Sequence, residues 1–450
     1  MSLVLILIAI IIFIVIATSK FKLHPFLTLL IAAFLTAFAY QLPINSITAT
    51  ITGGVGGLLG QIGLVIVIGT IIGTVLEKSG AAITMAEFII KLLGDRFPTL
   101  TMSLIGYIVS VPVFCDSGFV ILNSLKESMA QKMKTSPVAM SVALATGLYA
   151  THTFVPPTPG PIAAAGNLGL QDNLGLVIII GVFVAATAAI SGMLWANRFS
   201  KVEPDLEETA EHHIPDSDEV RASYGELPST FMAFAPIMIP ILLICLGSIA
   251  NLPSRPFAEG SLYSLFVFLG NPLNALLVGL LISFGLLKGE NKIILFSERI
   301  AQGLTAAAPI LLITGAGGAF GAVLKAAPIG SYLGETLSAL GIGVFMPFIV
   351  AAALKSAQGS STVALVTTSA LVAPLLPELG LATQMGRVLT VMAIGAGAMT
   401  VSHANDSFFW VVSQFSRMSV SLAYRAHTMA TLIQGVVAML LTYVLSLILL

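Results

Sequence analysis

The segment Val111-Pro-Val-Phe-Cys-Asp-Ser-Gly-Phe119 lies in the middle of an apolar run that covers residues 98–125. Its proline, aspartate and glycine interrupt a helix, and interrupted backbone is tolerated at membrane depth only where neighbouring helices shield it. Charged residues stand at both ends of the run: Asp95, Arg96, Lys126, Lys132 and Lys134. Because Lys and Arg favour the cytoplasmic side, both ends are predicted to be cytoplasmic. The run is therefore predicted to be a re-entrant helical hairpin with its tip inside the membrane.

The composition around this segment is that of a membrane protein. Of the 450 residues, 57% are hydrophobic and 9% are charged, whereas about 25% are charged in ordinary soluble domains. Uncharged runs of roughly 16 to 24 residues recur, which is the length a helix needs to cross about 30 Å of hydrocarbon. The net charge of -1 and the lack of a basic tract argue against nucleic acid as a partner. The sequence thus predicts an all-α polytopic membrane protein.

The first half of the chain is predicted to hold about five transmembrane helices and the hairpin. Residues 3–18 are apolar without a positive segment before them, which indicates a retained span rather than a cleaved signal peptide. Residues 81–97 mix apolar and charged positions, which suits a helix in the membrane interface. The remaining spans are expected at about 25–41, 48–76, 137–155 and 174–197, and prolines between 156 and 161 break the fourth span.

The second half is predicted to repeat this order. A polar, acidic linker over 198–229 separates an N-terminal membrane repeat, 1–197, from a C-terminal one, 230–450. The C-terminal elements are expected at about 230–250, 272–287, 302–324 (Gly-rich), a short amphipathic piece, a hairpin broken at 358–362, a broken span near 388–403 and a last span at 427–447. Because five is an odd number, the second copy enters from the opposite side. The halves are therefore predicted to be inverted repeats, with broken helices meeting at the midplane.

Short sequence matches support the repeat. Gly73-Thr-Val-Leu-Glu77 in the first half resembles Gly321-Ala-Val-Leu-Lys325 in the second. His152, just before the first break, corresponds to His403 at the second break. Both pairs lie at matching places in the order of elements.

Asp116, at the tip of the first hairpin, is the clearest ionisable residue inside an apolar run. A charged side chain at the bilayer centre costs roughly 2.5 to 3.5 kcal/mol on insertion scales, so few are kept without a reason. Proton coupling needs a group that gains and loses charge at this depth. Asp116 is therefore the leading candidate for ion coupling, and a structural ion pair or helix cap is the alternative.

The tip of the second hairpin is rich in hydroxyl and amide groups. Five residues there precede an apolar run: Gln358, Gly359, Ser360, Ser361 and Thr362. Such a run can begin a half-helix, whose free N–H groups and positive dipole end favour an anion. These residues are predicted to bind the substrate, and an ordinary Ser/Thr helix cap is the alternative. The nearby Lys355 either joins the site or extends toward the outer surface.

The most polar cluster inside an apolar region is Thr400-Val-Ser-His-Ala-Asn-Asp-Ser407. His403 and Asp406 are three residues apart and would share a face of a helix, so they are predicted to form a proton relay or, with Asn405, to bind substrate hydroxyls. Asp406 is also a second candidate for ion coupling. His152 and Thr158, beside the first break, are predicted to bind substrate as the counterpart. A structural network that holds the broken helices is the alternative for both clusters.

Other functional classes have little support in the sequence. An intramembrane hydrolase would need a triad, and the closeness of Ser402, His403 and Asp406 along the chain does not establish one. A primary pump would need a phosphate-binding loop, and none is present. The histidine pair at 212–213 lies in the charged linker and the two cysteines lie in apolar runs, so neither a metal site nor a disulfide is expected. A channel stays open as an alternative class.

The chain resembles the gluconate permease family of proton symporters, within the ion transporter superfamily, over nearly its whole length. The resemblance is carried by four motifs: Phe114-Cys-Asp-Ser-Gly-Phe-Val120, Val155-Pro-Pro-Thr-Pro-Gly-Pro161, Gln358-Gly-Ser-Ser-Thr-Val-Ala364 and Ser402-His-Ala-Asn-Asp-Ser407 with Phe409-Trp410. The chain differs from the family pattern at Cys115, Thr158 and Lys355, so the particular substrate is left open.

The resemblance implies a secondary active transporter, not an enzyme, in the bacterial inner membrane. Its expected cargo is gluconate, a related sugar acid or another small hydroxy-carboxylate, carried by proton symport. A sodium-coupled organic-anion transporter and a D-serine transporter are the alternatives. No cofactor beyond the proton gradient is expected; the expected partners are the organic anion and the lipid bilayer, and a homodimer is left open.

Overall fold

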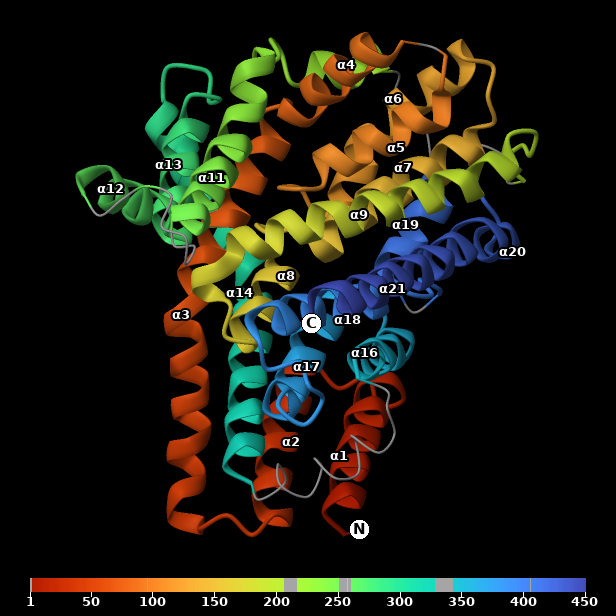
Figure 1. Ribbon diagram of the computed structural model, residues 1–450. Helices are drawn as coiled ribbons and strands as arrows, with labels where there is room; N and C mark the ends of the chain where they lie inside the picture. The colour runs from red at the N-terminus through yellow and green to blue at the C-terminus, as the bar shows by residue number, and fades with distance from the viewer. Residues whose placement is uncertain are drawn as a thin grey trace.

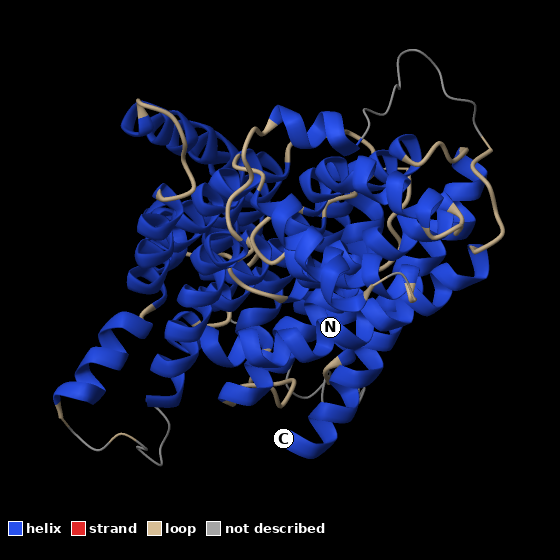
Figure 2. Ribbon diagram, turned by 90° about the horizontal axis from the view of Figure 1, so that it is seen from above, coloured by secondary structure: helices blue, strands red, loops and turns tan. Residues whose placement is uncertain are grey.

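The computed structural model describes residues 2–94, 96–205, 217–250, 257, 260–327, 343–404 and 406–450. These residues form helices, with no strand among them (Figure 1, Figure 2). Within them, six helical segments are long and apolar enough to cross a membrane, or seven if α12 (Ser261–Gly270) and α13 (Pro272–Phe284) together make one bent span. The prediction of an all-α polytopic membrane protein is confirmed.

Two helices of 35 residues each, α3 (Ile44–Lys78) and α14 (Lys292–Ala326), pack side by side (Figure 1). Gly54 lies against Gly318, and Gly303 lies against Ile71, so the start of each helix meets the end of the other. A Cβ atom at Gly54 would lie 2.5 Å from the carbonyl oxygen of Gly318, and glycine is what permits this approach of the two backbones. The pair therefore runs antiparallel, which is the orientation that the predicted inversion requires of these two helices.

Both predicted hairpins are present. Each consists of two helices joined at a short tip: α5 (Pro98–Val109) with α6 (Cys115–Lys132), and α16 (Phe345–Gln358) with α17 (Ser361–Val372). The second tip turns at Gly359, whose φ of 85° is the left-handed conformation that favours glycine at a helix end. Ser360 then caps α17, since its hydroxyl accepts a hydrogen bond from the N–H of Val363.

Both predicted broken spans are present as well. The first consists of α7 (Pro137–Phe154) and α8 (Pro159–Asn167), and the second of α18 (Gln384–Met399) and α19 (Ser407–Phe415). Each half then ends with a long helix: α9 (Leu174–Ala196) and α21 (Met429–Leu449). Side chains join α9 to α21 and to the turn before it, because Gln434 Nε2 on α21 donates to the carbonyl of Ala188, and Trp195 Nε1 donates to that of Ala426, just before α21. The order of elements matches between the halves, while their inversion as whole units and the domain boundaries stay predictions.

Four details depart from the predicted elements or add to them. Helix α14 begins about ten residues before the predicted start at 302, because its charged first turns continue the helix beyond the apolar run. Helix α12 was not predicted, since its ten residues are too few for a span, and α13 follows at an angle of 72°. The helix predicted for the membrane interface is present as α4 (Ala81–Leu93), and it packs on α11 (Thr230–Ala250). The amphipathic piece predicted in the second half lies outside the described residues.

Candidate substrate-binding site

Four half-helices begin where the hairpin tips meet the broken spans: α6, α8, α17 and α19. The starts of α6 and α19 adjoin, since the carboxyl of Asp116 interacts with the hydroxyl of Ser407. The starts of α8 and α17 adjoin, since a Cβ atom at Gly160 would lie 3.6 Å from the Cα of Thr362. Helix starts carry unpaired N–H groups and the positive end of the helix dipole. The fold therefore gathers the kind of backbone that binds anions.

A buried ion pair joins the second hairpin to the second break. Lys355, in the last turn of α16, is fully buried, and its Nζ donates to Oδ2 of Asp406 at 2.5 Å and to the carbonyl of Gly359 at 2.8 Å. The ammonium also lies 5.8 Å from the ring centre of Tyr149. The alternative prediction, that Lys355 extends toward the outer surface, is wrong, because its charge is neutralised inside the protein.

The polar chain continues from Asp406 to a residue that sequence reasoning missed. Oδ1 of Asp406 accepts from the N–H of Phe408 and so caps α19, while Oδ2 also accepts from the hydroxyl of Ser402. His427 Nε2 lies 3.2 Å from that hydroxyl, and the His427 side chain is fully buried. It stands in a π-helical turn, Tyr424–Thr428, a form often found at functional sites. The only sequence signal was a histidine at the start of a predicted span.

His403 does not share a helical face with Asp406, so that part of the prediction is wrong. Helix α18 ends at Met399 and α19 begins at Ser407, so His403 and Asp406 both lie outside these helices. His403 Nε2 instead lies 3.0 Å from the carbonyl oxygen of Ser356, on the second hairpin. The side chain that faces Ser402 is His427, and Ser402 in turn donates to Asp406, which is not the order of a hydrolytic triad.

The other predicted site residues lie at the hairpin tips and at the breaks. His152 is buried and stacks on Tyr149, with ring centres 6.4 Å apart. Thr158 precedes α8 as its N-cap residue, and its hydroxyl donates to the carbonyl of Val155. Gln358, Gly359, Ser360, Ser361 and Thr362 form the second tip, as predicted. Asn405 lies outside the described residues.

Three predicted site residues carry buried polar atoms that find no hydrogen-bond partner among the described residues. They are Oδ1 of Asp116, Nε2 of Gln358 and Nδ1 of His152. Buried polar groups in folded proteins are nearly always paired, so unpaired ones mark where a ligand or water belongs. Charge interactions connect the same region, because His152 and Cys115 each interact electrostatically with Lys355 and Asp406. Within the described chain, no three His, Cys, Asp or Glu side chains gather as metal ligands.

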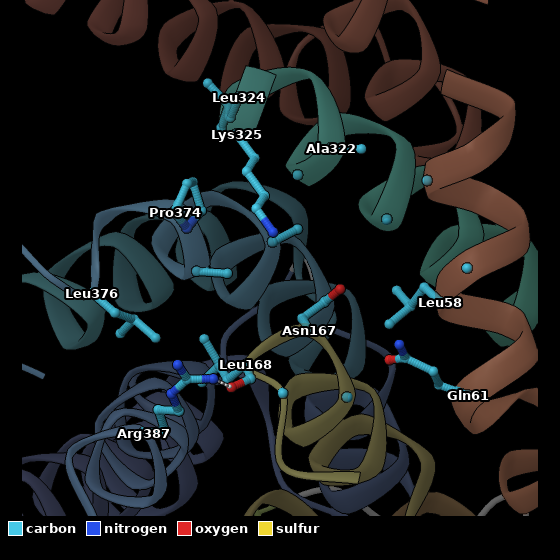
Figure 3. Close-up of a pocket in the computed structure, with 18 of the residues that line it drawn as sticks. Leu58, Gln61, Asn167, Leu168, Ala322, Leu324, Lys325, Pro374, Leu376 and Arg387 are labelled. Atoms are coloured by element: carbon cyan, nitrogen blue, oxygen red, sulfur yellow. Dashed lines mark hydrogen bonds between the residues drawn. The ribbon is translucent and has the colours of Figure 1, made fainter. Parts of the chain in front are cut away.

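A separate cavity of about 560 Å³ opens at the far ends of α8 and α17, between them and the long helices α3 and α14 (Figure 3). Lys325 and Arg387 contribute positive charge to its lining, Gln61 and Asn167 contribute amides, and no acidic residue is among the described residues that line it. Arg387 Nη1 also donates to the carbonyl of Leu168 (Figure 3). None of the predicted site residues lines this cavity. The cavity lies at the opposite end of α8 from the predicted site residues, and α8 is roughly 13 Å long, given nine residues at about 1.5 Å each.

Relatives named as permeases and transporters match nearly the whole chain. A gluconate permease of Pseudomonas aeruginosa is 33% identical over 97% of this chain and 95% of its own length. The D-serine transporter DsdX of Escherichia coli K12 is 33% identical over 97% of this chain and 96% of its own. With the apolar helices described above, these matches place the protein among multi-pass permeases of the bacterial inner membrane, and not among enzymes.

Two solved transporters share the fold. YdaH of Alcanivorax borkumensis has a TM-score of 0.68 at 15% identity, covering 94% of this chain and 98% of its own. MtrF of Neisseria gonorrhoeae has a TM-score of 0.65 at 14% identity, covering 94% and 96%. The sequence pattern of the family described as GntP family permease matches residues 1–448. The chain therefore belongs to the GntP permease family.

Proposed function

We propose that this permease imports gluconate, a related sugar acid or another small hydroxy-carboxylate together with protons. The observation that carries the proposal is the fully buried ammonium of Lys355 at the second hairpin tip, among helix starts that favour negative charge. An ionisable group kept inside a membrane protein marks a substrate or ion pathway. Relatives named gluconate permease and D-serine transporter both point to small carboxylates as cargo.

Charge balance favours a proton as the coupled ion. Asp116 and Asp406 interact electrostatically with each other, and Lys355 pairs with Asp406. A bound carboxylate adds a negative charge to this cluster, and an uncompensated charge away from water is unfavourable. Uptake of a proton by one of the two aspartates removes the excess. Both aspartates are therefore candidates to hold the coupled proton.

The substrate is proposed to lie between the tips and the breaks. Its carboxylate would meet Lys355 and the first turn of α17, where Ser361 and Thr362 add hydroxyl groups. Its own hydroxyls would meet the polar atoms beside the two breaks: His152, Thr158, His403 and Asn405. The unpaired amide of Gln358 is a further donor at this tip.

Transport by the purified protein in liposomes tests the proposal. Labelled gluconate should accumulate when the outside is made acidic, and a protonophore should abolish the accumulation. A sodium gradient at equal pH on both sides tests the sodium alternative, and D-serine tests the amino-acid alternative. Conductance without saturation or counterflow would indicate a channel and overturn the proposal.

A further inference from the structure

The ion pair between Lys355 and Asp406 is arranged so that either partner can change its contacts without losing all of them. Without Lys355, Asp406 would keep the Ser402 hydroxyl on Oδ2 and the Phe408 N–H on Oδ1. Without Asp406, Lys355 would keep the carbonyl of Gly359 and the face of Tyr149. An ammonium group has three N–H donors, and the described residues supply acceptors for two of them.

Given the proposed anion symport, we propose that the substrate carboxylate replaces Asp406 on the Lys355 ammonium and that the released Asp406 carboxyl takes up the coupled proton. In the empty protein, Lys355 and Asp406 are charged and paired. In the loaded protein, Lys355 pairs with the substrate, and Asp406 is protonated and neutral. The proton and the anion enter together, so the net charge of Lys355, Asp406 and any bound substrate is zero in both states.

The intermediate combinations are unfavourable for the same physical reason. Anion bound without a proton leaves Asp406 as a buried anion with no cation, and a proton bound without an anion leaves Lys355 as a buried, unpaired cation. Removing one partner from a buried ion pair is strongly unfavourable, because the remaining charge is left away from water without compensation. Each of the two events therefore favours the other, which is what symport requires.

Ser402 and His427 are positioned to hold Asp406 in both protonation states. A hydroxyl group both donates and accepts, so Ser402 can donate to the Asp406 carboxylate and accept from the Asp406 carboxylic acid. His427 Nε2, at 3.2 Å from the Ser402 hydroxyl, can accept or donate according to its tautomer. The titratable groups that interact electrostatically with Asp406 come from four elements: Lys355, Asp116, Cys115, Tyr149, His152 and His427.

Titration calorimetry of the purified protein with gluconate, repeated in buffers of different ionisation enthalpy, counts the protons taken up on binding. We expect the wild-type protein to take up about one proton per gluconate, so that its affinity for gluconate falls by up to about tenfold for each unit that the pH rises. Asp406→Asn should take up no proton, because the amide has no carboxyl group to protonate. Its affinity for gluconate should therefore not depend on pH, and Lys355 has no carboxylate that competes with the substrate.

Two further single variants distinguish proton uptake by Asp406 from proton uptake by another residue. Asp116→Asn should weaken gluconate binding but keep the uptake of one proton. Glu127→Gln removes the carboxylate beside Lys126, a second buried lysine among the described residues, whose Nζ lies 2.9 Å from Glu127; it should leave both binding and proton uptake as in the wild type. If Asp116→Asn lost the proton and Asp406→Asn kept it, the exchange would be overturned and proton symport would stand.

A charge-neutral double variant covers the case in which Asp406→Asn does not fold. Lys355→Gln with Asp406→Asn removes both charges of the pair, and it should bind gluconate weakly and take up no proton. Uptake of a full proton by this double variant would overturn the exchange. If the wild-type protein bound neither gluconate nor any other small organic acid, both the exchange and the proposed function would be overturned.

Discussion

The two hairpins share one backbone plan but carry opposite charges near their tips. Asp116 lies in the first turn after the first tip, and Lys355 lies in the last turn before the second. Lys355 is paired with Asp406, whereas one oxygen of Asp116 has no partner among the described residues. Each hairpin thus carries an ionisable residue near its tip, but the two residues differ in charge and in partner.

The hairpins also pack differently on the two long helices. Gly73 of α3 lies against Pro112 in the first tip, where a Cβ atom would be 2.4 Å from the Pro112 carbonyl oxygen. Gly321 of α14 is the counterpart of Gly73 in the sequence match. It lies against Ala370 near the far end of α17, where a Cβ atom would be 3.4 Å from the Ala370 carbonyl oxygen. The first hairpin thus meets its long helix at the tip and the second near its base.

The largest expected effect is that of Lys355→Gln, which tests whether charge pairing distinguishes the tips. It leaves Asp406 buried without a cation, so we expect a loss of about 3 to 5 kcal/mol in the free energy of unfolding. Denaturant or thermal unfolding in detergent measures it. Lys355→Gln with Asp406→Asn should recover most of the loss, and Asp116→Asn should lose much less. Equal losses for Lys355→Gln and Asp116→Asn would contradict the difference between the tips.

Gly73→Ala compared with Gly321→Ala tests the packing difference. The added methyl group at Gly73 must displace backbone of the first tip, so we expect a loss of about 1 to 3 kcal/mol. At Gly321 the methyl group meets ordinary contacts, and the higher helix propensity of alanine should make the change neutral or stabilising by up to about 1 kcal/mol. Unfolding of both variants under the same conditions checks the order, and a reversed order would show that the hairpins are packed otherwise.

Ser360→Ala tests the cap of the second hairpin. Losing the bond from the Val363 N–H to the Ser360 hydroxyl should lower the free energy of unfolding by about 1 kcal/mol. In the first hairpin, Phe114 holds the equivalent position before α6 and makes no side-chain cap. Hydrogen exchange should therefore quicken in the first turn of α17 and stay unchanged in α6. Faster exchange in both hairpins would mean that they unfold as one unit.

Asp205 lies outside both hairpins, so Asp205→Asn serves as a control, and it has the smallest expected effect. Its carboxylate accepts from the N–H of Ser419 at 2.6 Å and from the Ser419 hydroxyl. Slight burial acts to raise the pKa of Asp205, but the hydrogen bonds from Ser419 outweigh it, and the pKa is lowered overall. Its contribution to stability is therefore complete above the ordinary carboxyl pKa of about 4 and is lost as the pH falls through the lowered value. The stability gap between wild type and Asp205→Asn should narrow below about pH 4, and a constant gap would contradict the assignment.

Much of the fold was predictable because a membrane helix is indicated by the residues of its own segment. Charges at both ends of an apolar run, with proline and glycine at its centre, were enough to predict the first hairpin. The prediction of 230–250 agrees with α11, Thr230–Ala250, residue for residue. Helix α12 escaped because ten residues give no signal of a span.

The contacts inside the site were less predictable, because they depend on residues far apart in the chain. Lys355 and Asp406 are 51 positions apart, and no local pattern indicated that they would pair. The expected face shared by His403 and Asp406 needed a continuous helix, whereas α18 ends at Met399 and α19 begins at Ser407. His427 needed the same tertiary information, since its contact with Ser402 spans 25 positions.

The neutrality of the Lys355 and Asp406 pair bears on how the membrane voltage acts on this protein. One elementary charge that crosses 100 mV exchanges about 2.3 kcal/mol with the field. The paired residues add no net charge to an empty carrier, and a monovalent acid accompanied by one proton adds none to a loaded one. Under the proposed exchange of one proton per anion, voltage does little work on this pair in either half of the cycle, and an acidic exterior would drive accumulation even in a depolarised cell.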